Sequence, residues 1–357
     1  MRVDRVWLTD FRNYETAELA PAAGLTVVVG GNGEGKTNLL EAVGYLAMLS
    51  SFRGAPGDAL VRDGREAGVV RAEGWRDGRT VLLEAEVRVG GRARVQLNRQ
   101  PLRRSRELLG ALRVSVFAPD DLVVVKGGPA DRRRLLDDLL VSLHPKHDSV
   151  QGDVERVLRQ RNTLLRQAAG RLSLEVASTL DVWDAKLAEL GEELAVAREF
   201  AVARLEPEVG KAYDDVAATA ADVTLTYRRS WEGPLSGALA ASRADDVRRG
   251  VTLIGPHRDE LVLTIGGLPA RTHASQGEQR SLALALRLGA HRLVADDIGE
   301  TPVLLLDDVF SELDADRSDA LLHHLPAGQA LLTTASAVPA GARPDLVVRV
   351  AGGRVLV

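Results

Sequence analysis

The stretch Gly30-Gly31-Asn32-Gly33-Glu34-Gly35-Lys36-Thr37 decides the fold of this chain. It satisfies the pattern G-x-x-x-x-G-K-[ST], whose glycines let backbone N–H groups approach phosphate oxygens without steric conflict. A short β-branched run, Leu25–Val29, precedes it, and Asn38–Leu49 follows with apolar residues at helical spacing. The alternative is a glycine-rich turn that binds nothing, but such a turn requires neither flank. The sequence therefore predicts a strand, a phosphate-binding loop and a helix in an α/β domain.

Each position of this loop has an expected contact with ATP. Lys36 is expected to reach the β- and γ-phosphates, where it also serves catalysis, and Thr37 to place its hydroxyl on Mg²⁺, which prefers oxygen ligands. The N-terminal end of the following helix adds positive potential. The predicted ATP-binding residues are Gly30, Gly31, Asn32, Gly33, Glu34, Gly35, Lys36, Thr37 and Asn38.

A phosphate loop of this kind needs a carboxylate at the end of a neighbouring strand. The apolar run Val303–Leu306 ends in Asp307 and Asp308. Asp307 is expected to hold Mg²⁺ through its water shell, and Asp308 to accept a proton from the attacking water. Without the phosphate loop, the same residues could equally be an acidic loop after a core strand. The two motifs together favour a magnesium-dependent ATP site.

Composition places the chain among ordinary globular proteins. Its 357 residues, 45% of them apolar, are enough for about two domains. The absence of cysteine excludes disulfides, thiol nucleophiles and thiolate metal sites. No run approaches the length of a membrane span, and the first residues lack the apolar segment of a secretion signal. We therefore expect a cytoplasmic protein without a membrane partner.

Strand and helix patterns divide the chain into three segments. The stretch Arg132–Tyr213 is nearly free of strand signals and predicts two or three packed helices without a long coiled coil. We expect an ATPase head built from residues 1–125 and 251–357 around a helical insert at residues 126–250. The strands expected on either side of the insert are Val3–Leu8, Leu25–Val29, Thr80–Val87 with a hairpin at Gly90-Gly91, Val223–Tyr227, Val251–Ile254, Leu261–Ile265, Val303–Leu306 and Ala330–Thr333. A helix is expected over about residues 277–295.

The net charge of −4 hides a strong asymmetry. Between Arg88 and Arg134, eleven arginines and Lys126 stand against four acidic residues, a balance of +8. Such clusters neutralise DNA phosphates without reading bases, and no aromatic residue between Trp75 and Phe117 offers a stacking platform for a single strand. Any one of these arginines could instead form an ion pair within the fold. The candidate DNA-binding residues are Arg99, Arg103, Arg104, Arg132 and Arg133.

The segment Ser275-Gln276-Gly277-Glu278-Gln279 opens the predicted helix and resembles the S-G-G-Q/E signature of ABC ATPases. In that superfamily the serine, the glycine backbone and the helix N-terminus bind the γ-phosphate of ATP held by the other subunit, so the resemblance implies a dimer of half-sites. Read alone, the segment is also a capping box with Ser275 as N-cap. Asp314, in Ser311-Glu312-Leu313-Asp314, looks like the D-loop residue. Thr334 stands where the superfamily's switch loop usually has a histidine, and its hydroxyl can still bond phosphate.

With these motifs, the chain resembles the RecF family of bacterial recombination mediators, within the SMC-like ABC ATPases. The resemblance covers nearly the whole chain and implies an ABC/SMC-type head, a mixed sheet around a P-loop helix. It further implies a weak, DNA-stimulated ATPase that forms an ATP-dependent homodimer on duplex DNA near gaps and single-strand/double-strand junctions. RecR and RecO would be partners in loading the RecA recombinase, in DNA repair, recombination, replication and the SOS response at the nucleoid. Further matches are Leu8–Tyr14, Phe117–Asp121, Lys126–Pro129, Arg132–Arg134 and Gly255–Asp259.

Two other classes and one residue stay open at this point. A transporter ATPase subunit would have a more compact helical insert, and a structural SMC-type tether would need hundreds of heptad-patterned residues. Arg53 could lie near the nucleotide, as an arginine does in SMC-like heads, or in an internal ion pair.

Overall fold

A computed structural model describes residues 1–356 except 77, 218, 219 and 336. The chain forms two compact units. Unit 1 comprises Met1–Leu122, Lys211–Ala220 and Arg280–Val357, and unit 2 comprises Val123–Gly210 and Ala221–Gln279. The start of unit 2 lies close to the expected start of the insert, whereas residue 250, its expected end, lies inside unit 2.

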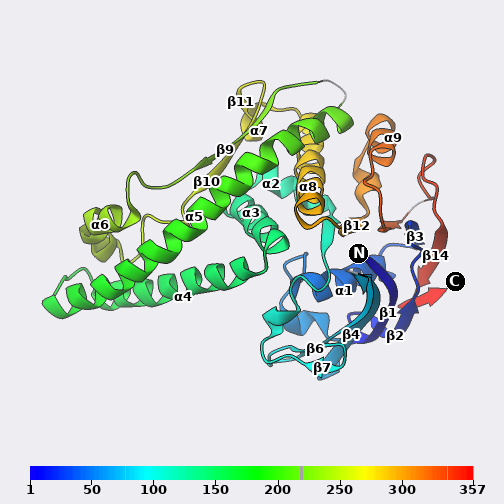
Figure 1. Ribbon diagram of the computed structural model, residues 1–357, viewed down its shortest axis with the longest axis horizontal. Helices are drawn as coiled ribbons and strands as arrows, with labels where there is room; N and C mark the ends of the chain where they lie inside the picture. Colours follow the sequence, from blue (N-terminus) through cyan, green and yellow to red (C-terminus); the bar gives the residue numbers. More distant parts are fainter. Residues whose placement is uncertain (77, 218–219, 336, 357) are drawn as a thin grey trace. The chain divides into compact units, whose positions relative to one another are not determined.

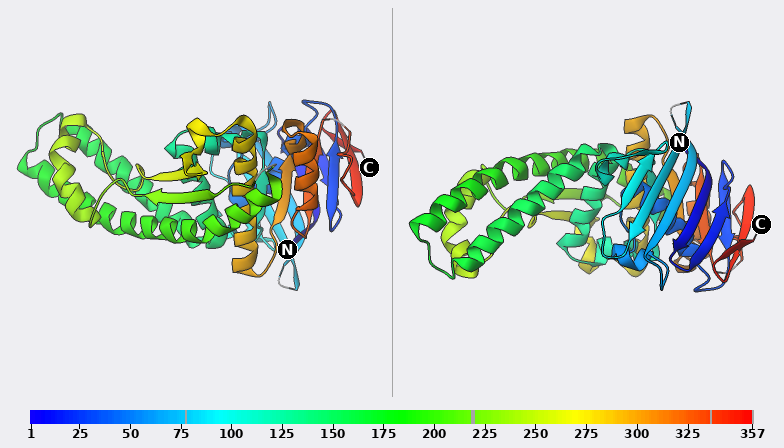
Figure 2. Two further views of the ribbon diagram at one scale, coloured as in Figure 1. Left: turned by 90° about the horizontal axis from the view of Figure 1, so that it is seen from above. Right: turned by 90° about the horizontal axis from the view of Figure 1, so that it is seen from below.

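The N-terminal part of unit 1 forms an antiparallel sheet, whose blue-to-cyan strands lie side by side in Figure 2 (right). Every second residue of its central strands is buried, as at Leu83, Ala85 and Val87, because one face packs on the core. The expected strand and hairpin around Gly90-Gly91 are confirmed. In spatial order the strands are β2 (Tyr14–Leu19), β1 (Arg2–Phe11), β4 (Ala67–Arg76), β5 (Arg79–Arg88), β6 (Arg94–Leu97) and β7 (Gln100–Pro101).

The second sheet of unit 1 is parallel except for its last hairpin strand. Its central strands are the continuous apolar runs that the sequence predicts, as expected for strands covered on both faces. Because the strands are parallel, their carboxyl ends meet at one edge. In spatial order they are β15 (Arg354–Leu356), β14 (Leu346–Ala351), β3 (Leu25–Val29), β13 (Ala330–Thr334), β12 (Val303–Asp307) and β8 (Val114–Phe117).

Helix α1 (Lys36–Met48) contacts strands of both sheets and completes the core of unit 1 (Figure 1). Its residues Leu39, Leu40, Val43 and Leu46 are almost fully inaccessible to solvent. The other helical segments of this unit are η1 (Gly57–Leu60), η2 (Ser105–Leu108), η3 (Pro119–Asp121), η4 (Val309–Glu312), α9 (Ala315–His323) and most of α8 (Gln276–Ile298). Among the described helices of the whole chain, none is long and apolar enough to cross a bilayer.

Unit 2 combines packed helices with a small antiparallel sheet. The expected helices over Arg132–Tyr213 are confirmed, and their buried residues include Leu158, Leu180, Leu187 and Leu194. The helices are α2 (Leu122–Lys126), α3 (Pro129–Leu143), α4 (Lys146–Gln167), α5 (Leu174–Val216), α6 (Leu235–Arg249) and α7 (Ala270–His273), with α5 ending in unit 1. The sheet has the order β11 (Leu268–Pro269), β10 (Glu260–Ile265) and β9 (Val223–Arg228).

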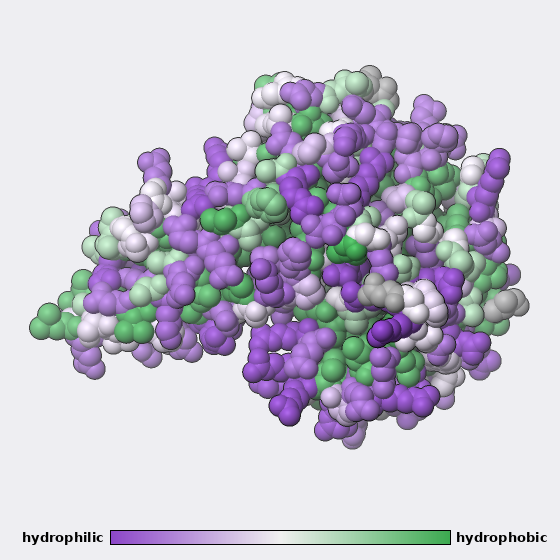
Figure 3. Space-filling model, viewed as in Figure 1, coloured by the Kyte–Doolittle hydropathy of each residue, from purple (hydrophilic) through white to green (hydrophobic). Residues whose placement is uncertain are grey.

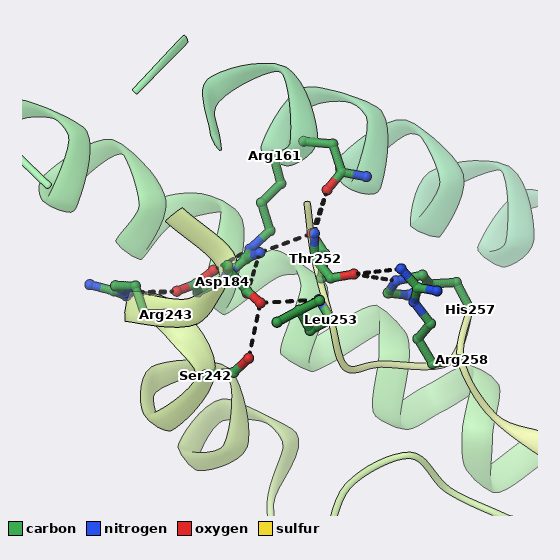
Figure 4. A network of polar contacts seen from close by, with 10 residues as sticks. Arg161, Asp184, Ser242, Arg243, Thr252, Leu253, His257 and Arg258 are labelled. Carbon is green, nitrogen blue, oxygen red and sulfur yellow. Dashed lines mark hydrogen bonds and ion pairs between the residues drawn. The ribbon is translucent and has the colours of Figure 1, made fainter. Parts of the chain in front are cut away.

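The strand expected at Val251–Ile254 is wrong, because these residues form an irregular segment whose polar groups are bonded by side chains (Figure 4). Asn162 Oδ1 accepts from the Thr252 backbone N–H at 2.8 Å, and Arg161 donates to the Thr252 hydroxyl at 2.9 Å. The Asp246 carboxylate accepts from the Leu253 N–H at 3.1 Å. Side-chain partners thus satisfy a backbone that the apolar pattern alone assigns to a sheet.

Candidate functional site

The β1–β2 turn of unit 1 packs on the backbone of the phosphate loop, which lies between β3 and α1. Gly35 has a left-handed φ of 116°, and a Cβ there would lie 2.7 Å from the amide nitrogen of Asn13. The Tyr14 hydroxyl donates to the Gly35 carbonyl at 3.0 Å. Neither Asn13 nor Tyr14 belongs to the predicted site, although both lie in a stretch that resembles the family. Their role depends on the packing of the β1–β2 turn against the phosphate loop, and the spacing of residues in the sequence does not predict that packing.

Lys36 is buried, and its ammonium group donates to the Gly31 carbonyl at 2.8 Å. Across the described residues, no carboxylate lies within ion-pair distance of this nitrogen. A buried cation without an anion is costly to desolvate, so the site is prepared for an anionic ligand. Together with the loop amides, this residue fits the phosphates of ATP.

The carboxylate of Asp307 is the centre of a hydrogen-bonded cluster at the sheet edge. The hydroxyls of Thr37 and Thr333 donate to its Oδ1, each at 2.8 Å. Thr333 in turn accepts from the Asp308 backbone N–H at 2.9 Å. Burial raises the pKa of Asp307, against the opposing effect of the two hydroxyl bonds. A hydroxyl and a carboxylate in contact fit the oxygen preference of Mg²⁺.

Asp308 and Thr334 complete this edge of the sheet. Asp308 has a left-handed φ of 47°, and its carbonyl accepts from the Ser311 hydroxyl at 2.7 Å, so the chain turns sharply after β12. Thr334 pairs in register with Val29, the last residue before the phosphate loop, and is buried. The same parallel register also places Thr333 at this edge of the sheet, next to Asp307. Thr333 is not among the predicted site residues.

Hydrogen bonds that involve Glu41 and Asn38 of α1 position Arg53 close to the phosphate loop. The fully buried Glu41 carboxylate accepts from Arg12 at 2.7 and 2.8 Å and from the Ser51 hydroxyl. Ser51 Oγ accepts from the Arg53 N–H at 3.1 Å, and the Arg53 guanidinium donates to Asn38 at 3.5 Å. Burial raises the pKa of Asp307, and the positive charge of Arg53 is one of the effects that oppose this rise, so Arg53 belongs to the electrostatics of this site.

The segment Ser275–Gln279 lies in unit 2 and forms the capping box that the sequence allows. The Glu278 N–H donates to Ser275 Oγ at 3.3 Å, while the Glu278 carboxylate accepts from the Ser275 N–H at 2.7 Å. The bond from the Ser275 backbone, followed by a bond from the Ser275 side chain, lowers the pKa of Glu278. Gln279 is buried and donates to the Ala270 carbonyl at 3.1 Å. Ser275 is exposed at the N-terminus of α8, a position where a helix attracts anions.

Asp314 caps helix α9 in unit 1. Its carboxylate accepts from the Arg317 N–H at 2.9 Å and pairs with the Arg317 side chain. The backbone bond, followed by the charge of Arg317, lowers the pKa of this exposed carboxylate. Arg317 also donates to Ser281 of α8 at 3.1 Å, so the predicted D-loop residue is tied to the helix that follows the signature segment.

The candidate DNA-binding arginines fall into two groups. Arg99, Arg103 and Arg104 are exposed around β6, β7 and η2. In the lower part of Figure 3, where Figure 1 places β6 and β7, hydrophilic residues border a hydrophobic patch. In the part of the chain that the structure describes, none of the three forms an ion pair. They present positive charge to solvent, as a surface that binds phosphates requires.

Arg132 does not fit the role expected for it. Its side chain is 8% exposed, and it binds Glu260 at 2.8 and 3.2 Å and the carbonyls of Val124 and Gly127. The next residue, Arg133, is half-buried and donates to the Asp259 carbonyl at 2.7 Å, and burial lowers its pKa. These two arginines hold unit 2 together, so Arg132 in particular is not available to DNA.

Comparisons with known proteins show the family of this chain. Residues 2–335 match the family model of the RecF/RecN/SMC N-terminal domain. The DNA replication and repair protein RecF of Streptomyces avermitilis is 44% identical over 351 residues, covering 94% of each chain. That of Frankia alni is 46% identical over 357 residues, covering 94% of this chain and 93% of the relative.

Solved structures show the same similarity. The recombination mediator protein RecF with ATP, in the RecFOR pathway, has a TM-score of 0.92 and 29% identity and covers 99% of this chain and 96% of that one. An Smc head domain from Pyrococcus furiosus shares the fold alone, with a TM-score of 0.58 at 17% identity, covering 100% and 96% of the two chains.

Proposed function

The chain belongs to the RecF family within the SMC-like ABC ATPases, and from this premise we propose that it is an ATP-dependent DNA-binding protein of recombinational repair and replication-fork maintenance. The observation that carries the ATP dependence is the buried Lys36 ammonium. It has no carboxylate partner among the described residues and directly follows the loop amides in the sequence. The hydrogen-bonded pair Thr37 and Asp307 supplies the adjoining oxygen ligands.

In this proposal each residue of the site has one task. The amides of residues 30–38 and Lys36 bind the phosphates of ATP, while Thr37 and Asp307 hold Mg²⁺. The bound metal neutralises charge on the phosphates. Asp308 takes a proton from the attacking water, and Thr334 donates a hydrogen bond toward the γ-phosphate in place of the usual histidine.

We propose that hydrolysis requires two copies of the chain. Ser275, Gln276, Gly277, Glu278 and Gln279 of one subunit meet ATP held by the loop of the other, and Asp314 lies at the same interface. The exposed Ser275 and Gln276 support this, because the N-terminus of a helix such as α8 attracts an anion. ATP then closes the dimer, and slow hydrolysis, stimulated by DNA, sets how long it stays closed.

Sedimentation in the presence of Mg²⁺-ATP tests the dimer. The wild-type chain should shift from monomer to dimer on addition of ATP. Lys36→Met removes the phosphate contact, and Ser275→Arg obstructs the facing half-site, so both variants should remain monomeric. Sedimentation of both variants as wild-type-like dimers would exclude the shared site.

We further propose that the dimer binds duplex DNA near single-strand/double-strand junctions and cooperates with RecR and RecO in loading the RecA recombinase. The named relatives support the pathway, since one solved structure is of the recombination mediator protein RecF in the RecFOR pathway. The exposed Arg99, Arg103 and Arg104 support contact with phosphates. A transporter subunit or a structural tether remains the alternative if duplex binding does not depend on ATP.

A further inference from the structure

The turn between β14 and β15, Gly352–Gly353, is bonded to the phosphate loop at a single residue, Glu34. The Gly353 N–H donates to the Glu34 carbonyl at 3.2 Å, and the Gly352 N–H donates to the Glu34 carboxylate. Asn13 of the β1–β2 turn donates to the same carbonyl at 2.9 Å. Glu34 is therefore held from two sides by segments far apart in the sequence.

The turn fits this place because both of its residues are glycines with left-handed φ, 55° at Gly352 and 68° at Gly353. These values match a two-residue type I′ hairpin turn. A Cβ at Gly353 would lie 2.5 Å from the Asn13 carbonyl oxygen, whereas a Cβ at Gly352 would meet nothing within 4 Å. The hairpin thus packs closely on the β1–β2 turn at one glycine only.

The side chain of Glu34 poses an electrostatic problem for a phosphate site. A free carboxylate on the loop would repel the phosphates, since like charges at short range disfavour each other. Here the carboxylate accepts from the Gly352 amide and is only partly exposed. The same bond fixes the loop at the residue before Gly35, where the backbone must follow a left-handed path.

We propose that the hairpin turn Gly352–Gly353 is a latch on the phosphate loop, and that Glu34 is a positioning residue through which the latch sets the affinity for ATP. The proposal rests on the ATP site proposed above. The latch bonds both the backbone and the carboxylate of Glu34, so that the loop amides are ordered before the nucleotide arrives. In this proposal the backbone amide of Glu34 belongs to the phosphate loop, while its side chain bonds the latch and not the phosphates.

Equilibrium binding of a fluorescent ATP analogue, together with hydrogen–deuterium exchange of residues 30–37 in nucleotide-free protein, tests the latch. Glu34→Ala should weaken binding by about fivefold to tenfold and speed exchange of the loop amides, because a bond to a charged group is lost. Gly353→Ala should do the same, although it alters only the hairpin. The matched control is Gly267→Ala in the β10–β11 turn of unit 2, where φ is 77° and a Cβ would meet nothing within 4 Å. It introduces the same left-handed strain away from the latch, so it should bind within twofold of wild type.

The combined variant Glu34→Ala with Gly353→Ala should weaken binding by less than the product of the single effects, because both changes break one contact. Tighter binding by Glu34→Gln would overturn the latch, since it would mean that the carboxylate merely repels the phosphates. Wild-type binding and exchange in both Glu34→Ala and Gly353→Ala would also overturn it. Lys36→Met separates the two proposals: if it binds like wild type, the ATP site itself is wrong, and if it alone loses binding, only the latch is.

Discussion

Asp308 is the site residue whose proposed role lies in ATP hydrolysis and not in ATP binding. Its backbone N–H donates to the Thr333 hydroxyl, and the residue directly follows Asp307, the proposed ligand of Mg²⁺. Asp308→Asn keeps the size and the turn but cannot take a proton. We expect ATP binding within a fewfold of wild type and steady-state hydrolysis lowered by about 100-fold or more. Phosphate release and nucleotide affinity, measured on the same preparation, check this, and an equal loss of both would assign Asp308 to binding instead.

His291 gives unit 1 a pH dependence of stability. Burial lowers its pKa from 6.5 to about 4, and its Nδ1 lies 2.8 Å from the Ser115 hydroxyl. The unfolded chain takes up a proton near pH 6.5 and the folded chain only near 4, so stability is fully present above pH 6.5 and falls as the pH drops between these values. The full effect is on the order of 3 kcal/mol.

Urea unfolding at pH 7 and pH 4.5 measures this effect. His291→Gln should show a smaller loss of stability between the two pH values than the wild type, whatever its stability at pH 7. Exposed His273→Gln is the control and should keep the wild-type loss. An unchanged loss in His291→Gln would mean that other groups cause the acid sensitivity.

At the level of residues, the sequence predicts the chemistry of the site better than its supports. Lys36, Thr37 and Asp307 follow from motif spacing, because the flanking strand and helix fix where they point. Asn13 and Gly353 do not, because they reach Glu34 only through the packing of two hairpins. The DNA contact predicted for Arg132 does not fit its burial. A cluster of arginines in the sequence does not show which of them forms the ion pair with Glu260.

Two groups of elements carry arginines with different roles. Those between β5 and η2 are exposed, whereas Arg132 of helix α3 is buried in an ion pair with Glu260. Replacing Arg99, Arg103 and Arg104 together by alanine should weaken duplex binding and reduce the slope of log affinity against log salt by about two to three. Thermal unfolding should change little, because these side chains are exposed. A shift assay across a salt series measures the slope, and an unchanged slope would move the DNA site elsewhere.

Arg132→Ala should behave in the opposite way. It leaves Glu260 without its partner in unit 2 and should lower stability by about 3 kcal/mol, with the salt slope of any remaining DNA binding unchanged. Urea unfolding and the same salt series measure both quantities. A reduced slope in the folded variant would restore Arg132 as a phosphate contact.

Prediction of elements succeeds where one periodicity prevails. Leu25–Val29, Val303–Leu306 and the helices over Arg132–Tyr213 are all confirmed, because continuous burial or one apolar stripe is written directly in the residues. Val251–Ile254 has the apolar content of a strand, but Asn162 and Asp246 bind its backbone instead. Such side-chain partners come from other helices, and local sequence gives no signal of them.

For the whole molecule, the phosphate loop and the signature segment fall in different units of one chain. Unit 1 contains Lys36, Thr37 and Asp307, whereas Ser275–Gln279 ends unit 2. The first part has a buried cation beside the hydrogen-bonded Thr37 and Asp307, and the second is a capped helix N-terminus. The proposal treats these two segments as half-sites that a second chain completes, so the proposed activity belongs to a dimer.

Mixing two inactive variants tests this central claim most directly. Lys36→Met and Ser275→Arg each damage both sites of a homodimer, but a mixed dimer has one site with an intact Lys36 from one subunit and an intact Ser275 from the other. ATP hydrolysis should therefore be low in each variant alone and should rise on mixing, with a maximum at equal amounts. Hydrolysis that stays at the sum of the separate rates at every ratio, although sedimentation detects mixed dimers, would contradict the shared site.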